Sequence, residues 1–332
     1  MLLRLLSLLL CLLASLPGIA LGFELQPLVT RNLSPSVIGF GLPSLGAARV
    51  LTPGSGQGQL IFDLISNSTE KTTSTENLLF DGESYRLALA GDYGYASGLE
   101  FGFALPLISH QGGVLDSFIE NWHDAFGLPQ GIRDQTAHNQ LDYSYLHQNG
   151  AGFSVQSDQA GIGDLSLRTA WQLFLDDDKR QAIAMRASLK LPTGSAEKLT
   201  GSGSTDFAVW LSGEQRQDTI AGQLFLYGGG GLLASSDGDL LSGQRRNLVG
   251  FFTLGCGLQI WPKLGFQLQF DGHSPFSQAS ELRELTDFSG QLAIGGSLAL
   301  GSQTVLELAV IEDVVVATAP DVVFHFALSH HF

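Results

Sequence analysis

Two places in the sequence bring serine and histidine together, as nucleophilic catalysis requires. His273 and Ser274 are adjacent, and Asp142, Ser144 and His147 share one short stretch. A serine nucleophile needs its Oγ in hydrogen-bond contact with the histidine, and a third group must orient the ring. Neighbouring strand residues point to opposite faces, so His273 and Ser274 cannot pair, and the second set is no better ordered. The sequence therefore predicts no catalytic residues and no enzyme.

A second group of polar residues has helical spacing. Glu120, His123 and Asp124 share one face of a predicted helix, as metal ligands on a helix do. No other histidine or cysteine is spaced to complete a ligand set, although the same long connection contains His110, His138 and His147. A solvated polar face is the better interpretation. The sequence predicts neither a metal site nor a cofactor.

Strands must position most of the remaining polar residues, because alternation of apolar and polar residues dominates the chain. The run 264–271 reads L-G-F-Q-L-Q-F-D, and the run 321–332 alternates in the same way and ends on Phe332. Such alternation is the mark of strands with two unlike faces. About twelve runs of this kind follow one another from Gly58 onward, an even number as in single-chain outer-membrane barrels. In a closed barrel the first strand pairs with the open edge of the last.

The connections between these runs alternate between short and long. The short ones are 94–97, 176–180, 215–218, 261–263 and 301–303, and the long ones are 68–82, 111–160, 193–203, 235–245, 274–286 and 312–320. Outer-membrane barrels show this rhythm, with short periplasmic turns and long extracellular loops. The sequence therefore predicts an all-β fold, an antiparallel transmembrane β-barrel of about twelve strands over residues 57–332.

Eight charged residues lie on the polar faces of the predicted strands: Arg86, Asp92, Glu100, Arg168, Arg186, Lys190, Glu214 and Glu307. A charged side chain that faces lipid costs roughly 2–4 kcal/mol at mid-depth, so these side chains are predicted to face the lumen. Two interpretations stay open. The preferred one is a ladder of ion pairs that holds the barrel together, and the other is a charged constriction that selects solutes.

The connection 111–160 is too long to be an idle loop. Within it, the segment 116–126 has apolar residues at helical spacing, and Ser117 to Glu120 matches a capping box, so a helix is predicted there. The helix is expected to fold into the barrel mouth as a plug, because it must bury Phe118, Ile119, Trp122 and Phe126. Lying on the outer leaflet or holding a partner are the alternatives.

The first 56 residues divide into two parts. Residues 1–22 form a predicted secretory signal peptide, with Arg4 before an apolar run and small residues before Phe23. Cys11 lies in the signal, so Cys256 is left alone in the mature chain and no disulfide is expected. Residues 23–56, rich in proline and glycine, are predicted to be an extended N-terminal periplasmic segment. A short arm packed on the surface is preferred to a small plug in the barrel mouth.

Composition excludes two classes of protein. The chain of 332 residues carries a net charge of −15, whereas nucleic-acid binding needs clustered lysine and arginine. Outside the signal region, no segment has the roughly 18 consecutive apolar residues of a membrane-spanning helix.

Several segments carry resemblances to known families. The motifs R-N-L-S-P at 31–35 and G-L-P at 41–43, the predicted helix and the terminal strand together resemble a proteobacterial family of exported outer-membrane proteins known only as a domain of unknown function. More loosely, G-I-G-D-L at 161–165 and L-K-L-P-T-G at 189–194 look like a strand pair of outer-membrane barrels encoded with aromatic-degradation (phenol meta-pathway) genes. The first resemblance implies location and fold, and the second implies uptake of a hydrophobic compound.

These inferences predict a monomeric channel or transporter for a small solute in the outer membrane of a Gram-negative bacterium. Its expected partners are outer-membrane lipid and the barrel-assembly machinery, which reads a last strand that ends in Phe332. The alternative is a structural or interaction barrel with a closed lumen. A remote alternative is an outer-membrane lipid hydrolase, which would need a serine and a histidine from different strands to meet at the outer rim.

Overall fold

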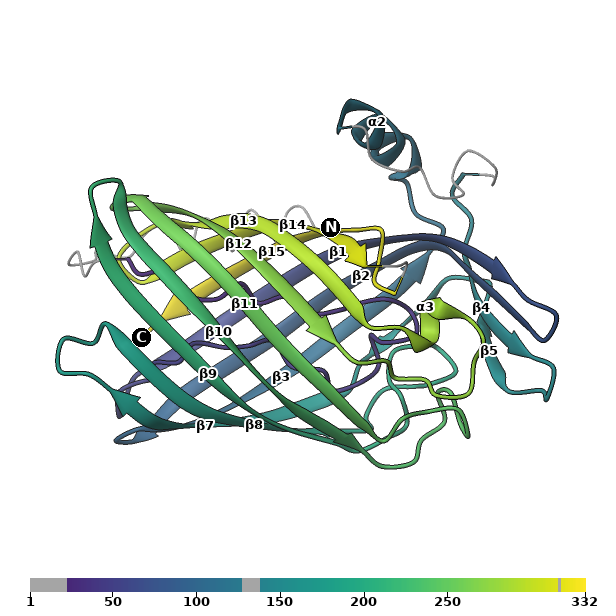
Figure 1. Cartoon of the computed structure of the whole chain (residues 1–332), viewed down its shortest axis with the longest axis horizontal. Helices are drawn as coiled ribbons and strands as arrows, with labels where there is room; N and C mark the ends of the chain where they lie inside the picture. The colour runs from purple at the N-terminus through teal and green to yellow at the C-terminus, as the bar shows by residue number, and fades with distance from the viewer. Residues whose placement is uncertain (1–22, 127–137, 316–317) are drawn as a thin grey trace.

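The computed structural model of the chain describes residues 23–126, 138–315 and 318–332, so the predicted signal peptide lies outside the described residues. Among these residues, twelve antiparallel strands form one closed barrel (Figure 1). They are β1 (Gly56–Thr72), β2 (Glu76–Ala96), β3 (Leu99–Gln111), β7 (Leu165–Leu175), β8 (Gln181–Leu191), β9 (Asp206–Thr219), β10 (Gly222–Ser235), β11 (Leu248–Trp261), β12 (Leu264–His273), β13 (Ser289–Ala299), β14 (Thr304–Val315) and β15 (Val322–His331). The barrel closes between β1 and β15, where Gln57 lies opposite His331. The predicted fold is confirmed.

Alternation along each strand sorts side chains between the lumen and the outer surface. On β2, Ala88 and Ala90 are buried inside the barrel, whereas Leu87 and Leu89 are exposed outside. Exposed leucine and phenylalanine side chains recur on the outer face of the other strands. The outer surface is therefore apolar, as in barrels that face lipid.

The connections are short at one end of the barrel and mostly long at the other. The predicted long connection 68–82 is wrong, because β1 and β2 stay paired as far as Thr72 and Asn77. This hairpin projects beyond the barrel and is widened by β4 (Asp142–His147) and β5 (Gly152–Val155), while β6 (Gln159–Ile162) pairs with β3 (Figure 1). Threonines favour strand conformation here, and Leu78 packs into the cluster that contains Tyr143.

Residues 23–55, here named the lumen segment, run inside the barrel. The outgoing leg follows β12: the Leu28 N–H donates to Gln269 Oε1 (3.0 Å) and the Thr30 hydroxyl donates to Asp271 (2.6 Å). Asn32 reaches Ser289 at the far end (3.0 Å). The predicted surface-packed arm is therefore wrong.

The lumen segment then turns and comes back along the opposite wall. The Gly41 N–H donates to Asp206 (2.7 Å), the Trp210 indole N–H donates to the Leu45 carbonyl (2.7 Å), and the Leu51 N–H donates to Glu100 (2.9 Å). Few of its residues are charged, and its apolar side chains pack into the two largest buried clusters. An extended apolar segment gains most by entering the barrel, provided that polar wall residues satisfy its backbone groups.

Helix α2 (Asp116–Phe126) lies outside the barrel wall (Figure 1). The ring of Phe118 is 5.9 Å from that of Phe324, which faces outward because its neighbours Val323 and His325 are buried in the lumen. The predicted plug is therefore wrong, and the lumen segment fills the barrel instead. The side chains of Trp122 and Phe126 lie outside the described part of the structure.

The other described helix, α3 (Arg283–Thr286), is a single turn in the connection before β13. No helix in the described ranges is long and apolar enough to cross a membrane.

Candidate functional site

The structure places the predicted lumen charges inside the barrel, and five of them take part in three ion pairs along one wall. Arg86 pairs with Asp63 (2.7 Å), Arg168 with Asp92 (2.8 Å) and Arg186 with Glu100 (2.9 Å). Each pair joins two strands, so the wall from β1 to β8 is cross-linked by charge. Removing one partner of such a buried pair would leave the other charge uncompensated, which is strongly destabilising.

The two remaining predicted carboxylates hold the lumen segment. Glu214 accepts from Arg49 (2.8 Å) and from the Ala48 N–H (3.0 Å), and both donors belong to the return leg. Glu307 accepts from the Val29 N–H (2.8 Å) and also contacts His325 Nε2 (3.0 Å). These glutamates therefore fasten the segment at two points on opposite walls.

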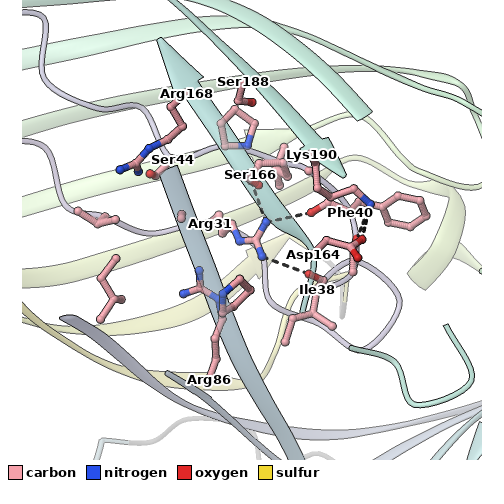
Figure 2. Close-up of a pocket in the computed structure, with 18 of the residues that line it drawn as sticks. Arg31, Ile38, Phe40, Ser44, Arg86, Asp164, Ser166, Arg168, Ser188 and Lys190 are labelled. Carbon is pink, nitrogen blue, oxygen red and sulfur yellow. Dashed lines mark hydrogen bonds and ion pairs between the residues drawn. The ribbon is translucent and has the colours of Figure 1, made fainter. Parts of the chain in front are cut away.

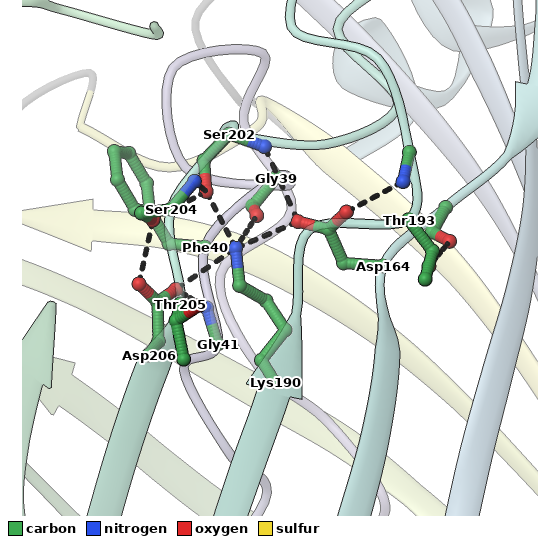
Figure 3. A network of polar contacts seen from close by, with 12 residues as sticks. Gly39, Phe40, Gly41, Asp164, Lys190, Thr193, Ser202, Ser204, Thr205 and Asp206 are labelled. Carbon is green, nitrogen blue, oxygen red and sulfur yellow. Dashed lines mark hydrogen bonds and ion pairs between the residues drawn. The ribbon is translucent and has the colours of Figure 1, made fainter. Parts of the chain in front are cut away.

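Lys190 is the centre of a polar network at the turn of the lumen segment. Its ammonium group lies 2.6 Å from Asp164 and 3.0 Å from Asp206, and it donates to the Gly39 carbonyl (3.0 Å). Figure 3 shows these acceptors converging on the lysine from three different parts of the chain. Asp206 accepts from Gly41 as well, so this network anchors the turn to β8 and β9.

Arg31 is carried by the lumen segment itself and has a different set of partners. Its guanidinium donates to the backbone carbonyls of Phe40 (2.9 Å), Leu42 (3.0 Å) and Ile38 (3.1 Å). These bonds close the turn between the two legs of the segment. Within the described parts of the chain, no carboxylate lies at ion-pair distance from this side chain.

A cavity of about 110 Å³ lies between the lumen segment and the charged wall. Figure 2 shows Arg31, Arg86 and Arg168 reaching toward it from the segment, from β2 and from β7. The other charged residues among those described at its lining are Arg186, Lys190 and Asp164. This arrangement of cationic side chains around a space inside a barrel is the candidate functional site.

Several residues of this site were missed by the sequence analysis. Asp63 and His325 lie on the polar faces of runs that were predicted as strands, so alternation alone could have identified them. Asp164 and Asp206 stand next to predicted strands and carried a weaker signal. No local pattern could have revealed Arg31, because its segment was placed outside the barrel.

A serine and a histidine from different strands do meet in the structure. The Ser84 hydroxyl on β2 lies 2.7 Å from His110 Nδ1 on β3, and His110 Nε2 lies 3.2 Å from the Leu199 carbonyl. Both side chains are almost fully buried, and neither lines the described cavities. A catalytic pair must be in contact with its substrate. Ser84 and His110 do not line a described cavity, and their contact is a hydrogen bond that joins β2 to β3.

The adjacent pair His273 and Ser274 points apart, as the sequence predicted. His273 Nε2 contacts Asn32 (2.9 Å), and its Nδ1 contacts the backbone carbonyl of Ser274 rather than the hydroxyl (2.8 Å). On α2, Glu120 contacts His138 (2.9 Å), whereas the side chain of His123 lies outside the described residues. Within the described ranges, no group of three histidine, cysteine or carboxylate side chains is placed to hold a metal ion.

Comparisons with known proteins identify the family of this chain and proteins of similar fold. Residues 3–332 match a family described as "Protein of unknown function (DUF3187)", and no curated protein matches the sequence. The structure is similar to the COG4313 outer membrane channel from Pseudomonas putida F1, with a TM-score of 0.57, 11% identity, and coverage of 86% of this chain and 98% of that chain. The NanC porin gives a TM-score of 0.47 at 8% identity, over 82% of this chain and 98% of that one. The first likeness shows the fold of an outer-membrane channel.

Proposed function

This chain belongs to the DUF3187 family, and we propose that it is an outer-membrane channel for a small solute, narrowed by its own lumen segment. The observation that carries the proposal is the cavity of about 110 Å³ inside the barrel, lined by charged side chains. A barrel that served only as a scaffold would have no need of an open space beside buried charges, because unfilled volume costs stability.

The solute path in this proposal runs beside the lumen segment. On one side lie the segment and its turn, and on the other lie the inward faces of β2, β3, β7 and β8. The space has room for several water molecules or one small solute. The looser family resemblance implies a hydrophobic solute. The lining of the cavity agrees with this only in part, because it is both charged and apolar.

Thiol modification in planar bilayers tests this path. Ser166 lines the cavity, so a Ser166→Cys variant, made in a Cys256→Ser background, should conduct until a methanethiosulfonate reagent is added. The reagent attaches a bulky group inside the cavity, so most of the current should disappear.

The matched control is Ser302→Cys, in the short turn between β13 and β14. Its modification should leave the current unchanged. Full current after complete labelling of the Ser166→Cys variant would place the path elsewhere. A wild-type protein without any conductance would reject the channel and favour the closed structural barrel.

A further inference from the structure

The cations and carboxylates of the candidate site are not distributed evenly around the cavity. Arg86, Arg168 and Arg186 line it, whereas the carboxylates of Asp63, Asp92 and Glu100, which pair with them, are absent from the described lining. Lys190 also lines the cavity, and of its two carboxylate partners, Asp164 and Asp206, only Asp164 belongs to the described lining. A solute in the cavity therefore meets positive groups first, and the compensating charges lie behind them.

Arg31 adds a positive charge that forms no ion pair with a carboxylate among the described residues. Its guanidinium is bound by three backbone carbonyls, which satisfy N–H groups but carry no formal charge. A guanidinium without an ion-pair partner attracts an anion over a few ångströms even in a water-filled lumen. Arg31 is also the arginine of this site that can be replaced without leaving a paired carboxylate behind.

Apolar side chains line the rest of the cavity. They come from the lumen segment and from the strands across from it: Val29, Ile38, Ile61, Pro106 and Ile108. An apolar surface favours burial of a solute's carbon atoms, while the arginines favour planar oxygen acceptors such as a carboxylate. Among the described cations of the lining, Arg31 is the one without an ion-pair partner, so it offers a position for a single negative charge.

We infer that this cavity binds a small monocarboxylate with an apolar body, with Arg31 as its charge-determining residue. The inference rests on the proposed function in that the cavity lies on the solute path. It names the class of solute, an anion with an apolar body, where the looser family resemblance implies only a hydrophobic compound. The inference depends on the residues that line the cavity. Binding of an anion there can therefore be tested whether or not the barrel conducts.

Trp210 provides a reporter of binding that is independent of conduction. Its indole ring lines the cavity and is held by a hydrogen bond to Leu45 (2.7 Å). In a background with Trp122→Phe, Trp171→Phe and Trp261→Phe, iodide should quench its fluorescence and caesium should not. Hexanoate should prevent the quenching of Trp210 fluorescence by iodide at lower concentrations than acetate does, because only hexanoate has a substantial apolar body.

The charge variants of Arg31 complete the binding test. Arg31→Gln should weaken iodide quenching by about fivefold, the effect of one unit charge at a few ångströms in a water-filled space, and Arg31→Lys should retain most of it. Lys263→Gln is the matched control, since it removes one positive charge from an exposed turn. Equal quenching by caesium and iodide, or an Arg31→Gln variant that behaves like the wild type, would overturn the inference.

Reversal potentials in a KCl gradient separate this inference from the proposed channel. An anion preference that falls in Arg31→Gln and persists in Arg31→Lys supports both. A silent bilayer with intact iodide quenching rejects the channel and keeps the anion site. A conducting protein without ion selectivity, together with equal quenching by both ions, keeps the channel and rejects the anion site.

Discussion

Individual charged residues survive inside this barrel because nearly every described one has a partner. Asp63 has two partners, because its carboxylate contacts both Arg86 (2.7 Å) and His325 (2.6 Å). His325 in turn contacts Glu307, which binds the backbone of the lumen segment. A chain of contacts therefore runs from Asp63 on β1 through His325 on β15 and Glu307 on β14 to the backbone of the lumen segment.

Removing the charge of Asp63 should therefore destabilise the barrel. We expect Asp63→Asn to lower the free energy of unfolding by about 3–5 kcal/mol, because Arg86 is left buried without its carboxylate. Urea titration of the protein in detergent micelles, followed by tryptophan fluorescence, measures this difference. Arg283→Gln breaks an ion pair with Asp287 that is largely exposed, and it should cost only about 0–1 kcal/mol. Equal effects of the two substitutions would contradict this account.

Among the elements, the lumen segment decides how much of the barrel stays open. Its turn packs against the connection before β9, where a side chain on Gly39 would come within 2.8 Å of the Gly201 backbone. That close approach lets Lys190 bind the Gly39 carbonyl (3.0 Å). The helix α2, which the sequence predicted as the plug, has no part in this contact.

A larger residue at position 39 should displace the turn of the lumen segment. We expect Gly39→Val to destabilise the fold by about 1–3 kcal/mol through overpacking, and to raise single-channel conductance because the displaced turn narrows the lumen less. Thermolysin should also cleave within residues 23–55 sooner than in the wild type. Gly58→Val is the control, since a side chain there meets no atom within 4 Å. Unchanged conductance together with unchanged cleavage would show that the turn does not control the opening.

At the scale of the whole molecule, the net charge of the protein is negative, whereas the lining of its lumen cavity is mostly positive. The chain carries a net charge of −15, yet five of the six charged residues found at the cavity lining are positive. Selectivity in a narrow lumen depends on these local groups rather than on the net charge, because salt screens distant charges.

Ion selectivity should consequently weaken as salt concentration rises. The Debye length falls from about 10 Å at 0.1 M to about 3 Å at 1 M, so the cationic lining acts over a shorter range. We expect the anion preference of the wild type, measured from reversal potentials, to be several-fold smaller at the higher concentration. A preference that did not change with salt would point to selection by size alone.

The sequence by itself determined the barrel and much of its charged wall. A strand with two unlike faces has a period of two, so residues such as Arg86 and Glu100 could be assigned to the lumen without knowing their partners. The alternation of short and long connections fixed the antiparallel order, with one error where β1 and β2 continue as strands in place of a loop.

Only the tertiary structure decided what fills the barrel. The lumen segment has no periodic pattern, and each of its contacts joins it to residues far along the chain, as Leu28 to Gln269 and Gly41 to Asp206. The helix 116–126 has a clear apolar face, but a helix of this kind can bury that face against the inside or the outside of a wall. Local pattern fixes which side of a strand a residue occupies, whereas the occupant of the lumen is chosen by competition between distant segments.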